Sequence, residues 1–181
     1  MNPFLQTSEV TKRYPGIVAL DSVSLSLMPG SVHALIGENG AGKSTFIKIV
    51  SGVIHPEEGE ILVDGRPSRL ESPRAAHGAG IAVVHQHTHL IPDLTIAENY
   101  ALRQGYTQHA PGAIAWGAMR RRAQQAASLL APDIDVRRDA RTLSGVEQQL
   151  VELSFGFAGS PRLVILDEPT AILPHRETDQ L

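Results

Sequence analysis

The feature that most constrains this chain is a glycine-rich loop, Gly37-Glu38-Asn39-Gly40-Ala41-Gly42-Lys43-Ser44. It satisfies the pattern G-x-x-x-x-G-K-[ST] in full. Glycine lets backbone N–H groups turn inward and approach phosphate oxygens closely, and a helix that follows adds its positive N-terminal end. The loop therefore predicts a nucleotide phosphate site, in which Lys43 reaches the β- and γ-phosphates and the Ser44 hydroxyl ligates Mg²⁺.

The residues on either side of the loop favour this prediction over a glycine-rich turn that precedes a lysine by chance. The run from Val32 to Ile36 is short and mostly apolar, and it predicts a buried strand that feeds the loop. From Ser44 to Val50 the apolar residues have helical spacing, which predicts a helix at the end of the loop.

The rest of the chain shows strand patterns near both ends and helix patterns in the middle. Between Ser22 and Leu27 serines alternate with apolar residues, which predicts a half-buried strand before the turn at Pro29-Gly30. Further short apolar runs predict strands at Ile61–Val63, Ile81–Val84 and Leu163–Leu166. Two capping-box patterns, Thr95 with Glu98 and Ser144 with Glu147, predict helix starts. Trp116 to Leu130 carries one apolar helical face, with Arg120, Arg121 and Arg122 on a solvated face.

This order predicts an α/β fold: a P-loop core, an antiparallel β subdomain near the N-terminus, and an inserted helical subdomain at about residues 88–159.

With 181 residues, the chain suits one domain with a proper core. The 16 basic and 19 acidic residues leave a net charge of −3, so no basic excess argues for nucleic acid. The chain has no cysteine, no secretory signal and no apolar run near the length of a membrane span. Work at a membrane would therefore require docking onto other chains that cross it.

Three further features carry candidate chemistry. Asp167 and Glu168 end an apolar strand, where charges need a partner or a function. Gln86 follows another strand and lies among His85, His87 and His89, which opens zinc binding as an alternative, although no acidic partner is near in sequence. Tyr14 by itself is compatible with an ordinary tyrosine at a strand end.

Four motifs resemble, in order and spacing, those of the ATP-binding subunit of ABC transporters: the loop, Gln86, the segment Leu143-Ser144-Gly145-Val146-Glu147-Gln148 and the run Leu163–Thr170. The resemblance covers almost the whole chain. The resemblance implies a single nucleotide-binding domain over residues 1–181 that binds and hydrolyses ATP. It implies that ATP contacts Tyr14, Gly37, Glu38, Asn39, Gly40, Ala41, Gly42, Lys43, Ser44 and Thr45.

The resemblance also implies roles for the other motif residues. Tyr14 would stack on adenine, and Gln86 would touch Mg²⁺ or the attacking water and sense the membrane domain. Asp167 would hold Mg²⁺ through water, and Glu168 would act as the general base. The segment Leu143–Gln148 would be the signature motif, a helix start directed at the γ-phosphate of ATP on the opposite subunit.

Within the family, the stretches Val84-His85-Gln86 and Leu90–Asn99 resemble importers of monosaccharides and of nucleosides, although features shared by all ABC importers are a competing explanation. Such proteins carry two ATPase halves, which makes this chain an expected first half that is incomplete at its C-terminus. The implied partners are permease subunits, a solute-binding protein and a second ATPase domain in a head-to-tail dimer. The implied location is peripheral, at the cytoplasmic face of the inner membrane.

Three departures from the family pattern keep other functions open. The signature has Ser144-Gly145-Val146 where Ser-Gly-Gly or Ser-Val-Gly is expected, so a branched side chain stands near the partner's phosphate. Pro174 follows Leu173 where an aspartate or threonine is expected, and His175 follows Glu168 too closely to be the switch histidine. The alternatives are a nucleotide-binding remnant or switch module without turnover, and a soluble ABC ATPase that acts on ribosomes or DNA.

Overall fold

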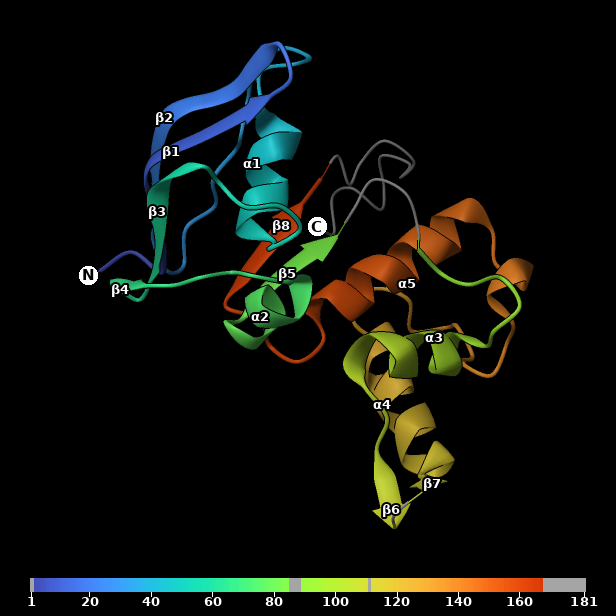
Figure 1. The fold of residues 1–181 in the computed structure, drawn as a ribbon. Coiled ribbons are helices and arrows are strands. Elements are labelled where there is room, and N and C mark those ends of the chain that lie inside the picture. Colours follow the sequence, from blue (N-terminus) through green and yellow to red (C-terminus); the bar gives the residue numbers. More distant parts are fainter. Residues whose placement is uncertain (1, 85–88, 111, 168–181) are drawn as a thin grey trace. The chain divides into compact units, whose positions relative to one another are not determined.

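The computed structural model describes residues 2–84, 89–110 and 112–167, shown in Figure 1. The chain divides into two compact units, and each unit is built from two separate stretches of sequence. The first contains Met1–Val83 and Ser160–Ile165, and the second contains Val84–Gly159 and Leu166–Leu181.

The first unit contains a four-stranded antiparallel sheet with the order β2-β1-β3-β4. Its strands are β1 (Leu5–Tyr14), β2 (Ile17–Leu27), β3 (Glu58–Val63) and β4 (Arg66–Pro67). In β2, the apolar residues of the predicted alternation are half-buried and the serines between them are exposed. The predicted antiparallel β subdomain is therefore confirmed.

Helix α1 (Lys43–Val50) belongs to the same unit and buries one face in its core. Phe46, Ile49 and Val50 pack into a cluster that also contains Val10 of β1 and Ile61 of β3. Helix α2 (Pro73–Gly78) was not anticipated from the sequence. Its N-terminal signal is nevertheless present, because the Ser72 side chain accepts a hydrogen bond from the Ala75 N–H and proline occupies the first turn.

Two further predicted strands, β5 (Ile81–Val84) and β8 (Leu163–Leu166), pair in a two-stranded sheet. The Arg162 N–H donates to the Gly80 carbonyl over 2.8 Å, and the Asp167 N–H donates to the Val84 carbonyl over 2.9 Å. The first bond joins the starts of the two strands and the second joins their ends, so the two strands run parallel.

The strand predicted at Val32–Ile36 is not present in the structure, where residues 31–38 have no regular secondary structure. Val32 is 100% exposed and Ile36 is 90% exposed. A strand needs a neighbour for its backbone N–H and C=O groups, and no described residue pairs with this run. The prediction of a buried strand from the apolar composition is therefore wrong.

The second unit is mainly helical, with α3 (Ile96–Gln104), α4 (Trp116–Ala127) and α5 (Gly145–Phe157). A short hairpin of β6 (Gln108–Ala110) and β7 (Ala113–Ile114) precedes α4, and the 3₁₀ helix η1 (Ala140–Thr142) precedes α5. The three helices share one apolar core, in which the rings of Tyr100 and Phe155 meet edge to face with centroids 5.0 Å apart.

Both predicted capping boxes are formed, at Thr95 for α3 and at Ser144 for α5. Within the Leu90–Asn99 segment, the buried side chain of Asn99 in α3 stabilises the turn that precedes the helix. Its side chain accepts from the Ile91 N–H over 2.7 Å and donates to the carbonyls of Ile91, Leu94 and Thr95. It thereby fixes the turn that leads into the helix. Among the described residues, no helix has the length and hydropathy needed to cross a bilayer.

Candidate nucleotide-binding site

The predicted phosphate loop lies in the first unit and passes close to β2 at Gly42. Gly42 has φ 87°, a left-handed conformation that favours glycine. A Cβ atom at this position would collide with the Ala19 carbonyl oxygen and with the Leu20 side chain. The second glycine of the motif is therefore required by a close approach of loop and sheet as well as by its backbone angle.

Lys43 is the first residue of α1, and its side chain folds back over the loop. Its Nζ donates to the Gly37 carbonyl over 2.6 Å and to the Glu38 carbonyl over 2.9 Å. The ammonium thus lies against the backbone that the motif predicts will surround phosphate. Anionic phosphate oxygens are stronger acceptors than these two carbonyls, so a nucleotide can replace them as partners of Nζ.

The N-terminus of α1 has no side-chain cap, a feature that it shares with α4 but not with α3 or α5. Gly42, its N-cap, makes no side-chain capping bond, and the first turn contains no acidic residue. Its free N–H groups and positive dipole end therefore lack compensation from this turn, and Ser44 lies exposed there. The serine hydroxyl offers an oxygen donor of the kind that Mg²⁺ prefers when phosphates supply the other ligands.

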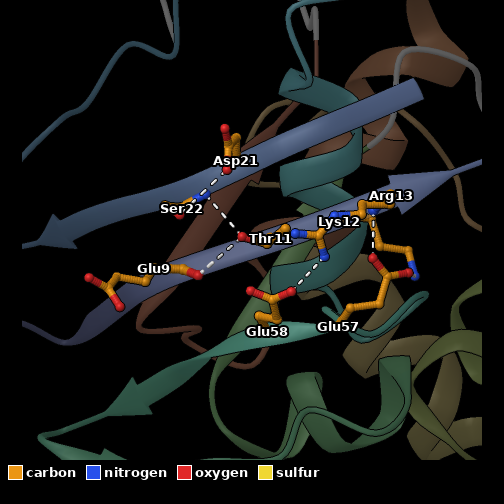
Figure 2. Close-up of polar contacts among 8 residues, drawn as sticks. All are labelled: Glu9, Thr11, Lys12, Arg13, Asp21, Ser22, Glu57 and Glu58. Atoms are coloured by element: carbon orange, nitrogen blue, oxygen red, sulfur yellow. Dashed lines mark hydrogen bonds and ion pairs between the residues drawn. The ribbon is translucent and has the colours of Figure 1, made fainter. Parts of the chain in front are cut away.

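Tyr14, the predicted adenine-stacking residue, ends β1 in the same unit. It is 41% exposed and pairs across the hairpin with Ile17. The Lys12 ammonium lies 5.8 Å from the centroid of its ring. Figure 2 shows the polar side chains around this strand end, where Lys12 and Arg13 meet Glu57 and Glu58. An exposed ring beside a cation can accept a flat ligand on its face.

The predicted signature motif opens α5, and its helix start is already capped. The Ser144 N–H donates to Glu147 Oε2 over 2.6 Å, and the Glu147 N–H donates to Ser144 Oγ over 3.2 Å. Hydrogen bonds from the backbone and the side chain of Ser144 to the carboxylate, with the nearby Arg138 as a lesser cause, lower the pKa of Glu147. The capping box predicted from the sequence is therefore formed here, and Glu147 places a carboxylate at the helix N-terminus.

Val146 is half-buried and packs against a cluster built on Val84 and Leu153. The preceding residue, Gly145, is exposed, and a Cβ there would meet nothing within 4 Å. The branched side chain that departs from the family pattern thus contributes to the core of its own unit.

The remaining predicted residues are only partly covered. Asp167 directly follows β8, at the position predicted from the sequence. Gln86 and Glu168, with His85 and His87, lie outside the described residues. Among the residues that the structure does describe, no three histidine or acidic side chains gather as a metal site.

The second unit also contains an open pocket of about 390 Å³ that was not anticipated from the sequence. Its lining includes Glu98 of α3, Trp116 and Arg120 of α4, and Arg137. Arg120, Arg121 and Arg122 are exposed, as predicted. The Arg120 charge acts on Glu98, whose pKa is lowered mainly by hydrogen bonds from Thr95.

Comparison with known proteins decides the family. A family model described as ABC transporter matches residues 20–171. The chain belongs to the ABC transporter family. Ribose import ATP-binding protein RbsA 1 of Rubrobacter xylanophilus is 45% identical to this ABC chain over 181 residues, which make up 100% of the chain and 36% of that protein. Arabinose import ATP-binding protein AraG of Burkholderia pseudomallei is 41% identical over 180 residues, or 98% of the chain and 35% of that protein. The chain therefore spans about a third of the length of these curated relatives.

Solved structures share the ABC fold with this chain. A dimeric post-hydrolysis state of the ATP-binding cassette MJ0796, bound to ADP and Pi, superimposes with a TM-score of 0.81 at 28% identity, over 97% of this chain and 78% of that one. The ATP-binding cassette MJ1267 superimposes with a TM-score of 0.82 at 25% identity, over 99% of this chain and 74% of that one. The predicted α/β fold of the ABC ATPase type is therefore confirmed.

Proposed function

We propose that this ABC chain binds ATP with Mg²⁺ at the loop Gly37–Ser44 and hydrolyses it to energise a sugar importer. The observation that carries the proposal is the geometry of the loop. Lys43 Nζ lies on the loop carbonyls at 2.6 and 2.9 Å, directly at the uncapped N-terminus of α1. A cation and free backbone N–H groups that lie close together form a binding site for a polyphosphate.

In this proposal the described residues bind and orient the nucleotide. Tyr14 stacks on the base, and the loop N–H groups and Lys43 neutralise phosphate charge. Ser44 would ligate the ion, and Asp167 would hold it through water. Bound Mg²⁺ supplies further charge neutralisation at the phosphates. Glu168 orients the attacking water and accepts its proton, and Gln86 responds to the state of the membrane partner. Residues of about 88–159 form the helical subdomain.

The names of the relatives support a sugar as the transported solute, since they include ribose and arabinose import proteins. A nucleoside importer is the other subfamily that the sequence resembles. The proposed partners are transmembrane permease subunits, a solute-binding protein and a second ATPase domain in a head-to-tail dimer. The proposed location is peripheral, at the cytoplasmic face of the inner membrane.

A second candidate is a nucleotide-binding module without turnover. The capped start of α5 favours it, because the Glu147 carboxylate lies where the partner's γ-phosphate is expected to approach. This candidate predicts ATP binding without phosphate release.

Phosphate release and ATP binding, measured together in the chain extended to the length of its relatives, separate these functions. We expect Glu168→Gln to bind ATP like the parent and to hydrolyse it at least about a hundredfold more slowly, because a general base acts on the chemical step and not on binding. Glu60→Gln, which changes an exposed carboxylate in β3, serves as the control. Undiminished turnover in the Glu168 variant would reject that residue as the base. A parent that binds ATP but releases no phosphate would establish the second candidate.

A further inference from the structure

The end of β1 that carries Tyr14 extends beyond the sheet on one side. The ladder between β1 and β3 stops at the pair Thr11–Glu58, whereas the ladder between β1 and β2 continues to Tyr14–Ile17. The register of that second ladder also shifts at Lys12 and Arg13. Residues 12–14 are therefore held by β2 on one edge and, within the described part of the chain, have no strand partner on the other.

Glu57, which precedes β3, covers this open edge with three hydrogen bonds. Its N–H donates to the Thr11 carbonyl over 3.0 Å. Its Oε2 accepts from the Arg13 N–H over 2.6 Å, and its Oε1 accepts from Lys12 Nζ over 2.9 Å. One carboxylate thus replaces the missing strand and binds a side chain as well, as Figure 2 shows.

The bond from Lys12 connects Glu57 to Tyr14. The Lys12 side chain is only 17% exposed, and its ammonium lies 5.8 Å from the centroid of the Tyr14 ring. The bond from Lys12 is the largest cause that lowers the pKa of Glu57, with the Arg13 N–H second, so the carboxylate is ionised at neutral pH. The cation is therefore held between the Glu57 carboxylate and the Tyr14 ring.

We propose that Glu57 is a positioning residue for the nucleotide base, which acts by fixing Lys12 and the backbone before Tyr14. The inference rests on the proposed role of Tyr14 in stacking on the base. Glu57 itself does not touch the nucleotide. Glutamine at this position keeps one acceptor oxygen for two donors, so either the Arg13 N–H or the Lys12 ammonium loses its partner, and the ring is no longer held in one orientation.

The test compares two ligands that share the phosphate site and differ in the base. MgATP and magnesium tripolyphosphate are titrated calorimetrically into the parent chain, Tyr14→Ala, Glu57→Gln and Glu58→Gln. Glu58 is the matched control, because its carboxylate pairs with the Arg13 side chain over 2.6 Å, and among the described residues it makes no hydrogen bond to Lys12. Loss of stacking is expected to weaken ATP binding by about tenfold in Tyr14→Ala. We expect a loss of about threefold to tenfold in Glu57→Gln and none in Glu58→Gln, with tripolyphosphate affinity unchanged in all three.

A double variant shows whether Glu57 acts through Tyr14. In the Tyr14→Ala background, Glu57→Gln should cause no further loss of ATP affinity, whereas a general effect on the sheet would add to the first loss. The positioning role is overturned if Glu57→Gln weakens both ligands equally, or if it leaves ATP affinity unchanged while Tyr14→Ala lowers it. In the latter case the proposed function stands. Unchanged ATP affinity in Tyr14→Ala would instead reject the stacking role on which the inference rests.

Discussion

Gly42 and Lys43 are neighbours in the loop, yet the structure assigns them separable tasks. Gly42 lets the backbone turn with φ 87° directly against the Ala19 carbonyl, whereas Lys43 places a charge on the loop carbonyls. From the sequence, phosphate binding alone was sufficient to explain why the motif contains both residues. The contact of Gly42 with β2 could not be predicted, because it depends on which strand packs behind the loop.

At the residue scale, we predict that Gly42→Ala destabilises the chain more than Gly40→Ala. Both glycines have left-handed backbone angles, φ 87° and 86°, so each alanine carries a penalty of about 1–2 kcal/mol. Only the Cβ at position 42 collides with the backbone of β2, since nothing lies within 4 Å of a Cβ at position 40. Urea unfolding of the two variants measures the difference. Equal losses of stability would show that the close approach to Ala19 is not a constraint in solution.

At the scale of elements, the predictions from local sequence were confirmed where the stabilising contacts are themselves local. The Thr95–Glu98 and Ser144–Glu147 capping boxes are formed as predicted, because all their bonds lie within one helical turn. The strand expected at Val32–Ile36 failed for the opposite reason, since pairing depends on a distant partner that local sequence does not specify. Helix α2 was missed although Ser72 and Pro73 provided a local signal for its start.

The capping boxes lead to a prediction about acid stability. Hydrogen bonds from Thr95 lower the pKa of Glu98, and those from Ser144 lower the pKa of Glu147. A carboxyl whose pKa is lower in the folded state stabilises the fold above its ordinary pKa of 4.5, and this contribution is lost as the pH falls through the folded value. The urea midpoint should therefore drop as the pH is lowered from about 5 towards 3.

The variants Glu98→Gln and Glu147→Gln should each flatten part of this acid dependence, because glutamine does not titrate. The same pair is expected to be less stable than the parent at pH 7, where the charged carboxylates accept the stronger bonds. Glu60→Gln, at an exposed position of β3, is the control that should keep the parent's profile. An unchanged profile in both capping variants would contradict this account of acid stability.

At the scale of the whole molecule, the chain builds each unit from two stretches that are far apart in sequence. Arg162 shows how the late segment joins the first unit: its guanidinium pairs with both carboxylate oxygens of Asp64 and lies 4.4 Å from the centroid of the Phe4 ring. No local sequence pattern indicates such contacts. The order of the elements could therefore be predicted from the sequence, but the contacts of Arg162 with Asp64 and Phe4 could not. The phosphate-loop motif could be recognised from the sequence because its residues are contiguous, whereas its role in nucleotide binding and the roles of Gln86 and Glu168 stay predictions.

The most direct test of the central claim is the affinity of the chain for ATP when the Lys43 charge is removed. A fluorescent ATP analogue is titrated with Mg²⁺ into the parent, Lys43→Ala and Lys48→Ala, the last being an exposed lysine in the final turn of the same helix. Because the Lys43 ammonium lies on the loop that is proposed to surround the phosphates, we predict that its loss weakens binding by at least about tenfold, or 1.4 kcal/mol. Lys48→Ala should bind like the parent. Equal affinity in all three proteins would contradict the assignment of Gly37–Ser44 as the nucleotide site.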